Sequence, residues 1–433
     1  MQADRFIPYR KQDIIEMCRS ELGNEFDQDS FLQFSELLSS YIHFSYHGIL
    51  ESLKNDYAPF DPNADTRLLN ALSYAQKRQC QHSFASNFAN VLNAANYEKI
   101  TEQDLQEALT EESLFKVRLE VEFEDFEQVV FYRRGESQKS ETLSSFFGLK
   151  KQTIEFTNYD RVAVFITLKD ASHFSNKNKA PIGFEPGSTI IKLFQNVPKA
   201  DLEMLFPNSE VKMRRIDKIL IGASAAVGGS VVLATKLGPS IILLAALFGF
   251  WLGLKDNPVE ITKQHLFTLG MGFGVLGGFV FKEWSKFKNR KIKFMKALSD
   301  NLYFKNLDNN AGVFHTLIDS AEEEDVKEAL LAYTFLLKDS DGMSASELDK
   351  TIETWFEQTH KCKIDFEVED ALEKLDRLEL VTKKVDLTRG PEPQTNSGPQ
   401  TIYIAKPLKE AKRQLDKKWD NIFSYNNDVT PQF

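Results

Sequence analysis

Three apolar runs near the middle of the chain, at 219–235, 237–254 and 266–281, contain no Asp, Glu, Lys or Arg. Each has about 16 to 18 residues, so a helix rising 1.5 Å per residue would cross most of a hydrocarbon core of about 30 Å. On either side, charged and apolar positions mix as they do in water-soluble elements. We therefore predict a transmembrane segment at 212–290 between soluble regions.

The soluble regions differ in their hydrophobic period. Between residues 1 and 112, apolar residues recur at helical spacing. Two such apolar helix faces begin at Ile14 and at Phe31. From 113 to 211 the period changes to two, which predicts a small antiparallel sheet with strands at 117–123, from Val129, at 153–157, at 161–168 and at 188–195. We thus expect an α+β membrane protein with a helical N-terminal region followed by a β-rich domain.

The region after the membrane segment is predicted to be helical again. A connector at 291–320 leads into a domain at 321–433 with helices at 322–337, 344–360 and 366–379 and strands at 380–386 and 400–405. Three helices followed by a two-stranded wing are typical of a winged-helix domain. A final basic, amphipathic helix is expected at about 408–422.

Small residues recur at every fourth position of each apolar run, and would form one face of a helix. They are Gly222, Ala226, Ser230 and Ala234 in the first run, Ala245, Gly249 and Gly253 in the second, and Gly270, Gly274 and Gly278 in the third. In lipid such faces allow close approach of helices. We therefore predict a helix-packing role for these residues.

Two other interpretations apply to the same segment. Its glycine-rich string at 270–278 resembles a nucleotide-binding loop, but no strand precedes it and no Lys-Ser or Lys-Thr ends it. The three runs could instead form a hairpin buried in a soluble protein, although three successive uncharged runs argue against this.

Basic residues flank the apolar segment on both sides. They are Lys212, Arg214, Arg215 and Lys218 before it, and Lys282, Lys286, Lys288, Arg290, Lys291 and Lys293 after it. Since Lys and Arg collect on the cytoplasmic side of membranes, both flanks and both termini are predicted to be cytoplasmic. An even number of crossings follows, so two crossings are favoured over three, with one run re-entrant or packed against the others.

Composition limits the partners and the compartment. The formal net charge is −10, which argues against a general nucleic-acid binder. The three cysteines match no zinc or redox spacing, and the charged N-terminus lacks the apolar core of a secretory signal. We expect a multi-pass protein of the inner cell membrane or of an organelle membrane, with its soluble domains in the cytoplasm.

No pattern of catalytic residues stands out, and we expect no catalytic residue, no cofactor and no metal. His43, His47 and Glu51 could share a helix face, but the HExxH motif is absent and no further ligands cluster nearby. The acid run Glu322–Asp325 is predicted to lie in the first turn of a helix, where it complements the helix dipole.

The predicted helix at 366–379 would be the recognition helix of the winged-helix domain. It carries many acidic residues, namely Glu367, Glu369, Asp370, Glu373, Asp376 and Glu379. Because phosphates would be repelled by this face, we predict a protein partner rather than DNA.

Short blocks along the chain resemble one known family. They include Ala95-Asn96-Tyr97, Thr101–Leu105, Phe131–Gly135, Ile191–Phe194, Asn301–Lys305, Asn309-Asn310 and Lys327–Tyr333. These blocks are similar to the domain shared by transmembrane protein 143 and its bacterial, algal and plant relatives. The resemblance implies a membrane location and an uncharacterised domain with predicted membrane helices, but no activity. The family is expected to have two spans, so the third apolar run is a departure.

The leading hypothesis is a non-enzymatic integral membrane scaffold that assembles with copies of itself or binds a protein partner. One alternative is an oligomeric pore gated by the soluble domains, although no ionisable residue lies within the runs. Another is an enzyme acting at the membrane surface, which would need a polar cleft.

Overall fold

The computed structural model describes most of the chain, in a series of ordered stretches. These are residues 4–70, 72–110, 118–145, 150–175, 185–212, 230, 238–254, 262–386 and 400–423. They group into two compact units, the first comprising 1–107, 124–199 and 305–433 and the second comprising 108–123 and 200–304. The second unit thus interrupts the first twice along the chain, and each is described by itself.

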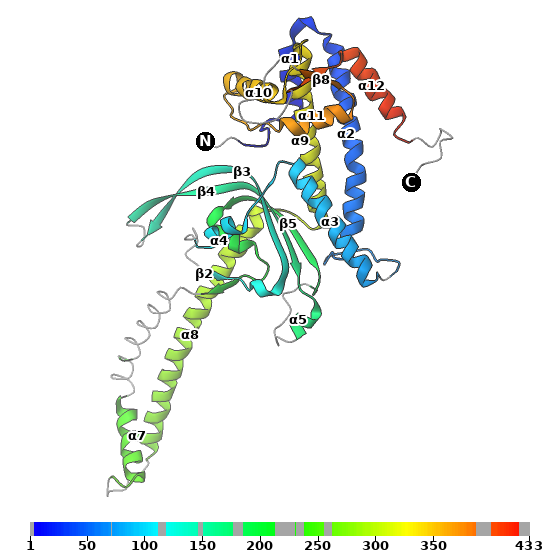
Figure 1. Cartoon of the computed structure of the whole chain (residues 1–433). Helices are drawn as coiled ribbons and strands as arrows, with labels where there is room; N and C mark the ends of the chain where they lie inside the picture. Colours follow the sequence, from blue (N-terminus) through cyan, green and yellow to red (C-terminus); the bar gives the residue numbers. More distant parts are fainter. Residues whose placement is uncertain are drawn as a thin grey trace. The chain divides into compact units, whose positions relative to one another are not determined.

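The first unit begins with four helices, α1 (Lys11–Leu22), α2 (Gln28–Tyr57), α3 (Tyr74–Ala94) and α4 (Glu102–Thr110), the last of which continues past its boundary (Figure 1). Polar side chains cap the N-termini of α2, α3 and α4. The Asp27 carboxylate accepts hydrogen bonds from the first turn of α2, and Ser73 forms a reciprocal capping box with Gln76 at the start of α3. Thr101 Oγ1 accepts a hydrogen bond from Asp104 N in the first turn of α4.

An antiparallel sheet of five strands forms the β part of this unit. Its order is β1 (Glu98–Lys99), β3 (Phe126–Ser145), β4 (Lys150–Leu168), β5 (Thr189–Pro198) and β7 (Asn306–Asn309). The mixed α+β class and the antiparallel sheet are therefore confirmed. The predicted strands at 153–157 and 161–168 are one continuous strand, β4, which pairs with β3 along its whole length with one register shift between Phe126 and Gln128. Two short helices, α5 (Ala171–Ser175) and the 3₁₀ helix at Lys199–Leu205, flank β5.

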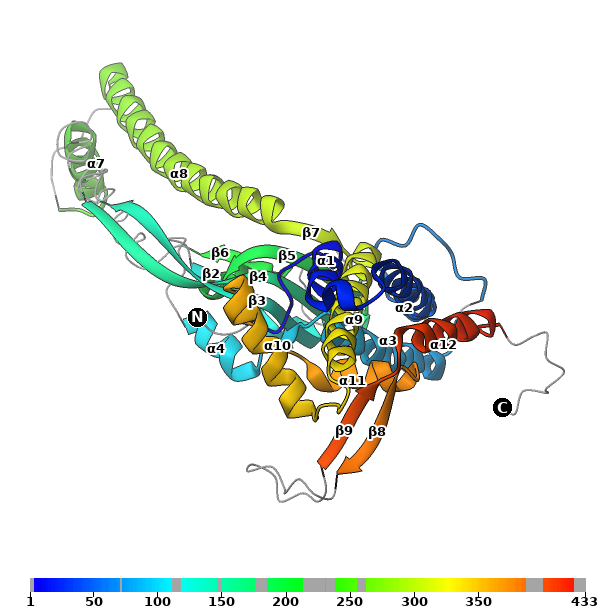
Figure 2. The same cartoon turned by 90° about the horizontal axis from the view of Figure 1, so that it is seen from above.

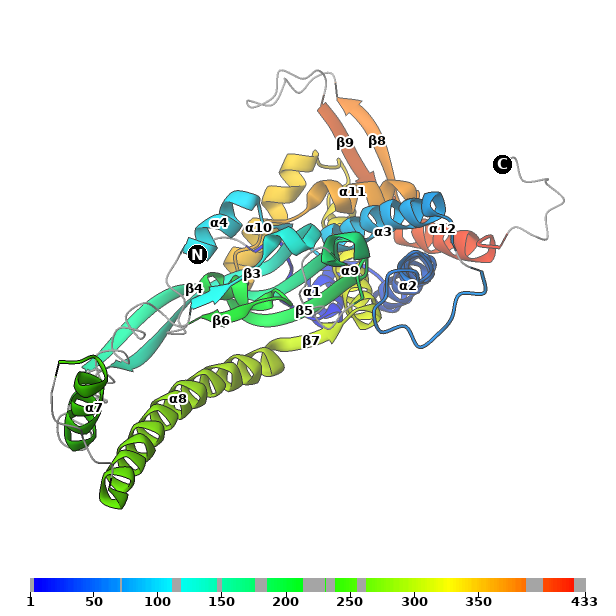
Figure 3. The same ribbon diagram turned by 90° about the horizontal axis from the view of Figure 1, so that it is seen from below.

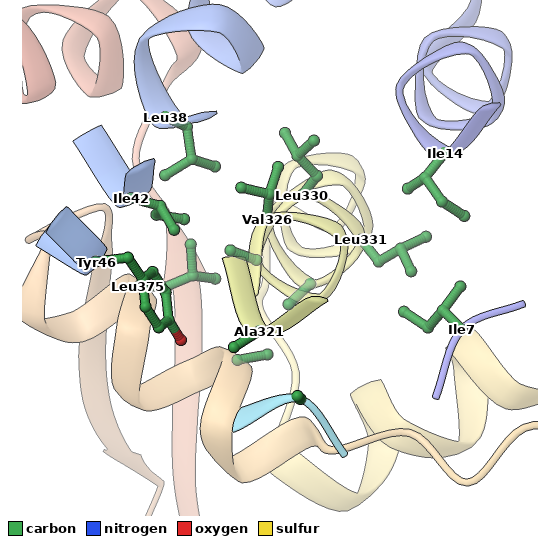
Figure 4. Packing of buried hydrophobic residues seen from close by; sticks show 14 of the residues in the cluster. Ile7, Ile14, Leu38, Ile42, Tyr46, Ala321, Val326, Leu330, Leu331 and Leu375 are labelled. Atoms are coloured by element: carbon green, nitrogen blue, oxygen red, sulfur yellow. The ribbon is translucent and has the colours of Figure 1, made fainter. Parts of the chain in front are cut away.

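Helix α9 (Ala311–Lys338) is the centre of the first unit, and it packs against α1, α2, α3, α10 and α11. Figure 4 shows Leu38, Ile42 and Leu375 facing α9 on one side, and Ile7 and Ile14 facing it on another. Side chains are buried all around its second half, from Val326 to Leu336. Helices from both ends of the chain therefore share one hydrophobic core with the sheet.

The C-terminal elements follow the predicted order closely. They are α10 (Ala345–His360), α11 (Val368–Arg377), β8 (Val381–Asp386), β9 (Gln400–Ala405) and α12 (Leu408–Asp420). β8 and β9 form an antiparallel ribbon (Figure 2), and an isolated bridge joins Met343 to Tyr403. The α12 helix packs against α2.

The second unit contains a two-stranded sheet and two apolar helices. β2 (Arg118–Glu120) pairs with β6 (Glu210–Lys212), so the strand predicted at 117–123 does not join the main sheet. α7 spans Gly238–Trp251 and α8 spans Lys263–Lys305, and α8 is a single, gently curved helix (Figure 3). The first apolar run, with Gly222, Ala226 and Ala234, lies outside the described residues apart from Ser230.

The predicted connector at 291–320 is not one element. α8 continues to Lys305, β7 follows at once and pairs with β5, and α9 begins at Ala311. The prediction that a helix starts near residue 322 is therefore wrong by about three turns. Apolar residues of α9 before the acid run, such as Val313, Phe314 and Leu317, are fully buried and extend the helix toward the sheet.

Candidate functional site

A buried cluster of charges on α9 is the best-built polar site in the first unit. Asp325 and Glu328 lie three residues apart on one helix face, and Lys374 of α11 reaches both. The Lys374 ammonium is 2.7 Å from Asp325 Oδ1 and 2.8 Å from Glu328 Oε2. Tyr46 Oη donates to Asp325 Oδ2 at 2.8 Å, and Asn96 Nδ2 donates to Glu328 Oε1 at 3.0 Å. One ammonium is thus shared by two carboxylates, and the cluster joins α2, the end of α3, α9 and α11.

A second buried pair lies beside this cluster and holds the N-terminal segment. Lys327 Nζ donates to Glu324 Oε1 at 2.8 Å and to the backbone oxygens of Ile7 and Tyr9 at 2.9 and 3.1 Å. Glu324 Oε2 accepts from Ile7 N at 3.0 Å. All three donors of this ammonium therefore have acceptors, which is what a charge exposed by only 3% requires.

The acid run Glu322–Asp325 has a different role from the predicted one. It lies in the middle of α9 rather than in a first turn, so it cannot complement the helix dipole. Glu322 pairs with His43 and Lys11, and Glu323 accepts a hydrogen bond from Lys11 N. Together with Glu324 and Asp325, the run connects α9 to segments far away in the sequence.

Burial shifts the protonation of the shared cluster. It raises the pKa of Glu328 to about 7 and also raises the pKa of Asp325, although Lys374 opposes both shifts. Burial alone would lower the pKa of Lys374, but Glu328 and Asp325 outweigh it and raise that pKa. Two carboxylates with one ammonium leave an uncompensated negative charge, so proton uptake at Glu328 near neutral pH neutralises the cluster.

A cleft of about 600 Å³ opens onto this cluster between α2, α3 and α11. Asp325, Tyr46 and Lys374 line it on the inside. The rest of the lining mixes polar side chains, such as Ser45, Asn87 and Arg377, with apolar ones, such as Ile49 and Val91. The arrangement can exchange a proton and hold helices together, and the residues that line it include no Cys or His.

The other candidates for chemistry form no metal-binding cluster among the described residues. His43 and His47 are exposed on α2, and no group of three or more His, Cys, Asp or Glu in the described ranges could hold a metal. The three cysteines are free thiols, and burial raises the pKa of Cys18 to about 12, which keeps it from acting as a thiolate.

Residues of the short blocks that carry the family resemblance meet in this part of the fold. The Arg134 guanidinium lies 5.1 Å from the Tyr97 ring centroid and 5.3 Å from that of Phe6. Asn310, at a φ of 49°, donates its N–H to Ile191 O and accepts from Ile191 N through its side chain. Together with the Asn96–Glu328 bond, these contacts give the blocks a structural role at the junction of sheet and helices.

The predicted helix-packing residues of the second and third apolar runs lie on or just after α7 and on α8. For Gly249, Gly270, Gly274 and Gly278, an added Cβ would meet no atom within 4 Å apart from the helix's own nearby backbone. Gly253 follows α7 with a φ of 70° and is equally open. No described part of the chain therefore packs on these glycines, and their packing role stays a prediction.

The apolar half of α8 is exposed. Residues Lys263–Lys286 are the single described helix long and apolar enough to cross a membrane, and only 6% of that window is buried. Phe267, Phe273 and Phe281 are exposed by 68%, 58% and 65%. α7 is apolar as well, but its stretch Ser240–Trp251 is shorter than a span.

Comparison with known proteins identifies one domain. Residues 159–312, about a third of the chain, match the model of a family described as a protein of unknown function (DUF3754). The chain carries this domain. It runs from β4 through β5, α7, α8 and β7 to the start of α9. No solved structure matches the chain. The match makes no link to transmembrane protein 143, so that resemblance stays a prediction.

Proposed function

We propose that the protein is an integral membrane scaffold without catalytic activity, anchored by α7 and the first half of α8. The exposed apolar surface of α8 carries the proposal, since patches this large on a soluble monomer are rare and lipid would cover them. Trp284 is 57% exposed beside the basic residues at the end of this stretch, as is typical of side chains at a membrane interface.

A membrane hairpin with two crossings fits the charges of the flanks best. α7 is about 21 Å long and too short to span alone, so its crossing would need residues of the first apolar run or a thinned bilayer. Ser240 Oγ donates to Thr268 O at 2.9 Å and joins α7 to α8. Basic residues before and after the hairpin support a cytoplasmic position of both termini, at the inner cell membrane or an organelle membrane, and the resemblance to transmembrane protein 143 supports a membrane location.

Partner binding is proposed for the C-terminal elements. The order α9, α10, α11, β8, β9, with the Met343–Tyr403 bridge, supports a winged-helix arrangement. Lys374, the basic residue of α11 nearest its middle, is engaged with Asp325 and Glu328, and acidic residues dominate the rest of the helix. This helix suits a protein partner or a second copy of the chain better than DNA.

A charge placed in the apolar half of α8 tests membrane insertion. Phe273→Lys is expected to cost about 2.5–3.5 kcal/mol at the centre of a bilayer, but nothing in water. The measurement is the fraction of the full chain that stays with membranes after alkaline carbonate washing. Leu69→Lys is the matched control, since Leu69 is 97% exposed in a loop of the first unit.

We expect wild type and Leu69→Lys to remain in the membrane pellet and Phe273→Lys to be partly extracted. A wild-type chain that is soluble without detergent would overturn the anchor. A chain that is strictly monomeric by native mass spectrometry at every concentration would overturn self-assembly and leave the anchor standing.

A further inference from the structure

The second half of α8 carries a basic collar, defined here as residues 282–296. It contains seven Lys or Arg and one acid, Glu283, in a chain whose net charge is −10. Its basic residues are Lys282, Lys286, Lys288, Arg290, Lys291, Lys293 and Lys296. The collar begins directly after the apolar run. Its positive charge needs negatively charged groups to balance it.

Of the four collar side chains of Lys or Arg that the structure describes, three are uncompensated. Lys282, Lys288 and Lys296 are exposed and form no ion pair with another described residue, and Glu283 pairs with Lys286 at 2.6 Å. The Lys288 ammonium lies 5.3 Å from the centroid of the Trp284 ring. An exposed indole with an ammonium above it is suited to the headgroup layer, where one end is apolar and the other is wet.

Continuity of the helix fixes where the collar lies. α8 is unbroken from Lys263 to Lys305, a length of about 65 Å, which is twice the thickness of a hydrocarbon core. If the apolar half spans the bilayer, the stretch Lys282–Lys288 extends about 9 Å from its edge. This length is close to the Debye length of about 8 Å at physiological salt, so these cations lie within the range over which anionic lipids attract them, and the attraction is strongest for Lys282.

We infer that the basic collar binds the headgroups of anionic phospholipids in the cytoplasmic leaflet. The inference rests on the proposed membrane anchor and adds the class of lipid that surrounds it. Nucleic acid is the other polyanion that a basic helix could bind. It is disfavoured because the chain as a whole is acidic, whereas headgroups lie within reach of a helix that leaves the membrane at Lys282.

The test measures which lipids associate with the full chain when it is reconstituted in phosphatidylcholine vesicles. Electron paramagnetic resonance of spin-labelled phosphatidylserine and of spin-labelled phosphatidylcholine gives the relative association of each with the protein. The collar variant is Lys282→Gln/Lys286→Gln/Lys288→Gln. The control, Lys409→Gln/Arg413→Gln/Lys417→Gln, removes the same charge from exposed positions of α12.

Wild type and the α12 control are expected to prefer phosphatidylserine about three- to tenfold at low salt, and the preference should vanish in 1 M NaCl. The collar variant should show a ratio near one. Equal association of both lipids with wild type, or a preference that the collar variant retains, would overturn the inference.

Carbonate washing of the same vesicles separates this inference from the proposed anchor. If the chain stays in the vesicles but shows no lipid preference, the collar inference alone fails. If the chain is washed off, the anchor fails and the inference with it. Binding of a 20-nucleotide RNA that is lost in the collar variant, without any lipid preference, would assign the collar to nucleic acid instead.

Discussion

The charged cluster on α9 and the apolar half of α8 reverse the usual placement of polar and apolar side chains. Glu328 and Asp325 are buried, and every charge of the cluster has a partner in the same unit. Phe273 and its neighbours on α8 are exposed, and no described part of the chain covers them. The buried carboxylates thus have partners within the described residues, whereas the apolar surface of α8 has no cover among them.

The largest effect is expected from removing the shared cation of the cluster. Lys374→Met leaves two buried carboxylates without their partner and should lower the free energy of unfolding by about 3–5 kcal/mol. Thermal unfolding of the full chain in mild detergent measures this. Lys383→Met is the control, because Lys383 pairs with Asp376 at 2.9 Å with both side chains 45% exposed, and should have a much smaller effect. Equal effects of the two variants would mean that the cluster is solvated.

Two glycines of the first unit differ in the space around the position that a Cβ would take. Gly342 has a φ of 80°, and an added Cβ would come within 2.5 Å of Ile404 Cγ1 and 2.6 Å of Tyr403 O. Gly342→Ala should therefore destabilise the chain by about 2–4 kcal/mol. Gly48→Ala in α2, where a Cβ would meet nothing within 4 Å, should instead stabilise by roughly 0.5–1 kcal/mol. The melting temperatures of both variants, measured together, check the opposite signs.

The pH dependence of stability tests the protonation of Glu328. Its pKa is about 7 in the folded chain and lies near 4.5 for an unfolded chain, so between these values the folded chain holds an extra proton. The resulting stabilisation is complete below about pH 4.5 and is lost as the pH rises through about 7. The free energy of unfolding of wild type should therefore fall by on the order of 2–3 kcal/mol across this window, and Glu328→Gln should abolish this fall.

Unfolding of wild type and Glu328→Gln at pH 5, 6, 7 and 8 measures the slope. Glu369→Gln, which changes an exposed carboxyl on α11, should leave the slope unchanged. An unchanged slope in Glu328→Gln would show that the cluster stays fully ionised over this range.

The smallest effect is expected on α8, and it separates folding from assembly. Gly274 has open space around its Cβ position, so Gly274→Leu should not disturb the fold. If the small-residue face packs against another helix in lipid, the substitution should weaken association on the order of 1 kcal/mol. Native mass spectrometry of the oligomer in detergent measures this, with Val275→Leu as control. Unchanged association would remove the packing role.

Local elements were predictable where pattern and capping agree. The boundaries of α10 and α12 follow from their apolar spacing, and α10 begins after Ser344, which forms a capping box with Glu347. The antiparallel sheet follows from its period of two. Its edges were not predictable, because β1 and β7 have only two and four residues and owe their strand geometry to neighbours distant in sequence.

The charged cluster was missed for a related reason. Nothing in the sequence states that Lys374 reaches Glu328, since ion pairs between distant segments leave no spacing to recognise. A signal did exist in the stretch from Val326 to Leu336, where Lys327 and Glu328 interrupt an otherwise apolar run. Charges within a helix that is apolar on all sides indicate buried pairs rather than solvent.

The bond between Ile7 N and Glu324, which joins residues 317 positions apart, sets the order of events during synthesis. At about 5–20 residues per second, a ribosome needs roughly 15–60 s to make the chain between them. The apolar stretch of α8 emerges before α9, so the first two helices wait with their apolar faces uncovered while that stretch is being made. We therefore expect the faces of α1 and α2 that pack against α9 in the finished fold to stay uncovered until α9 is complete.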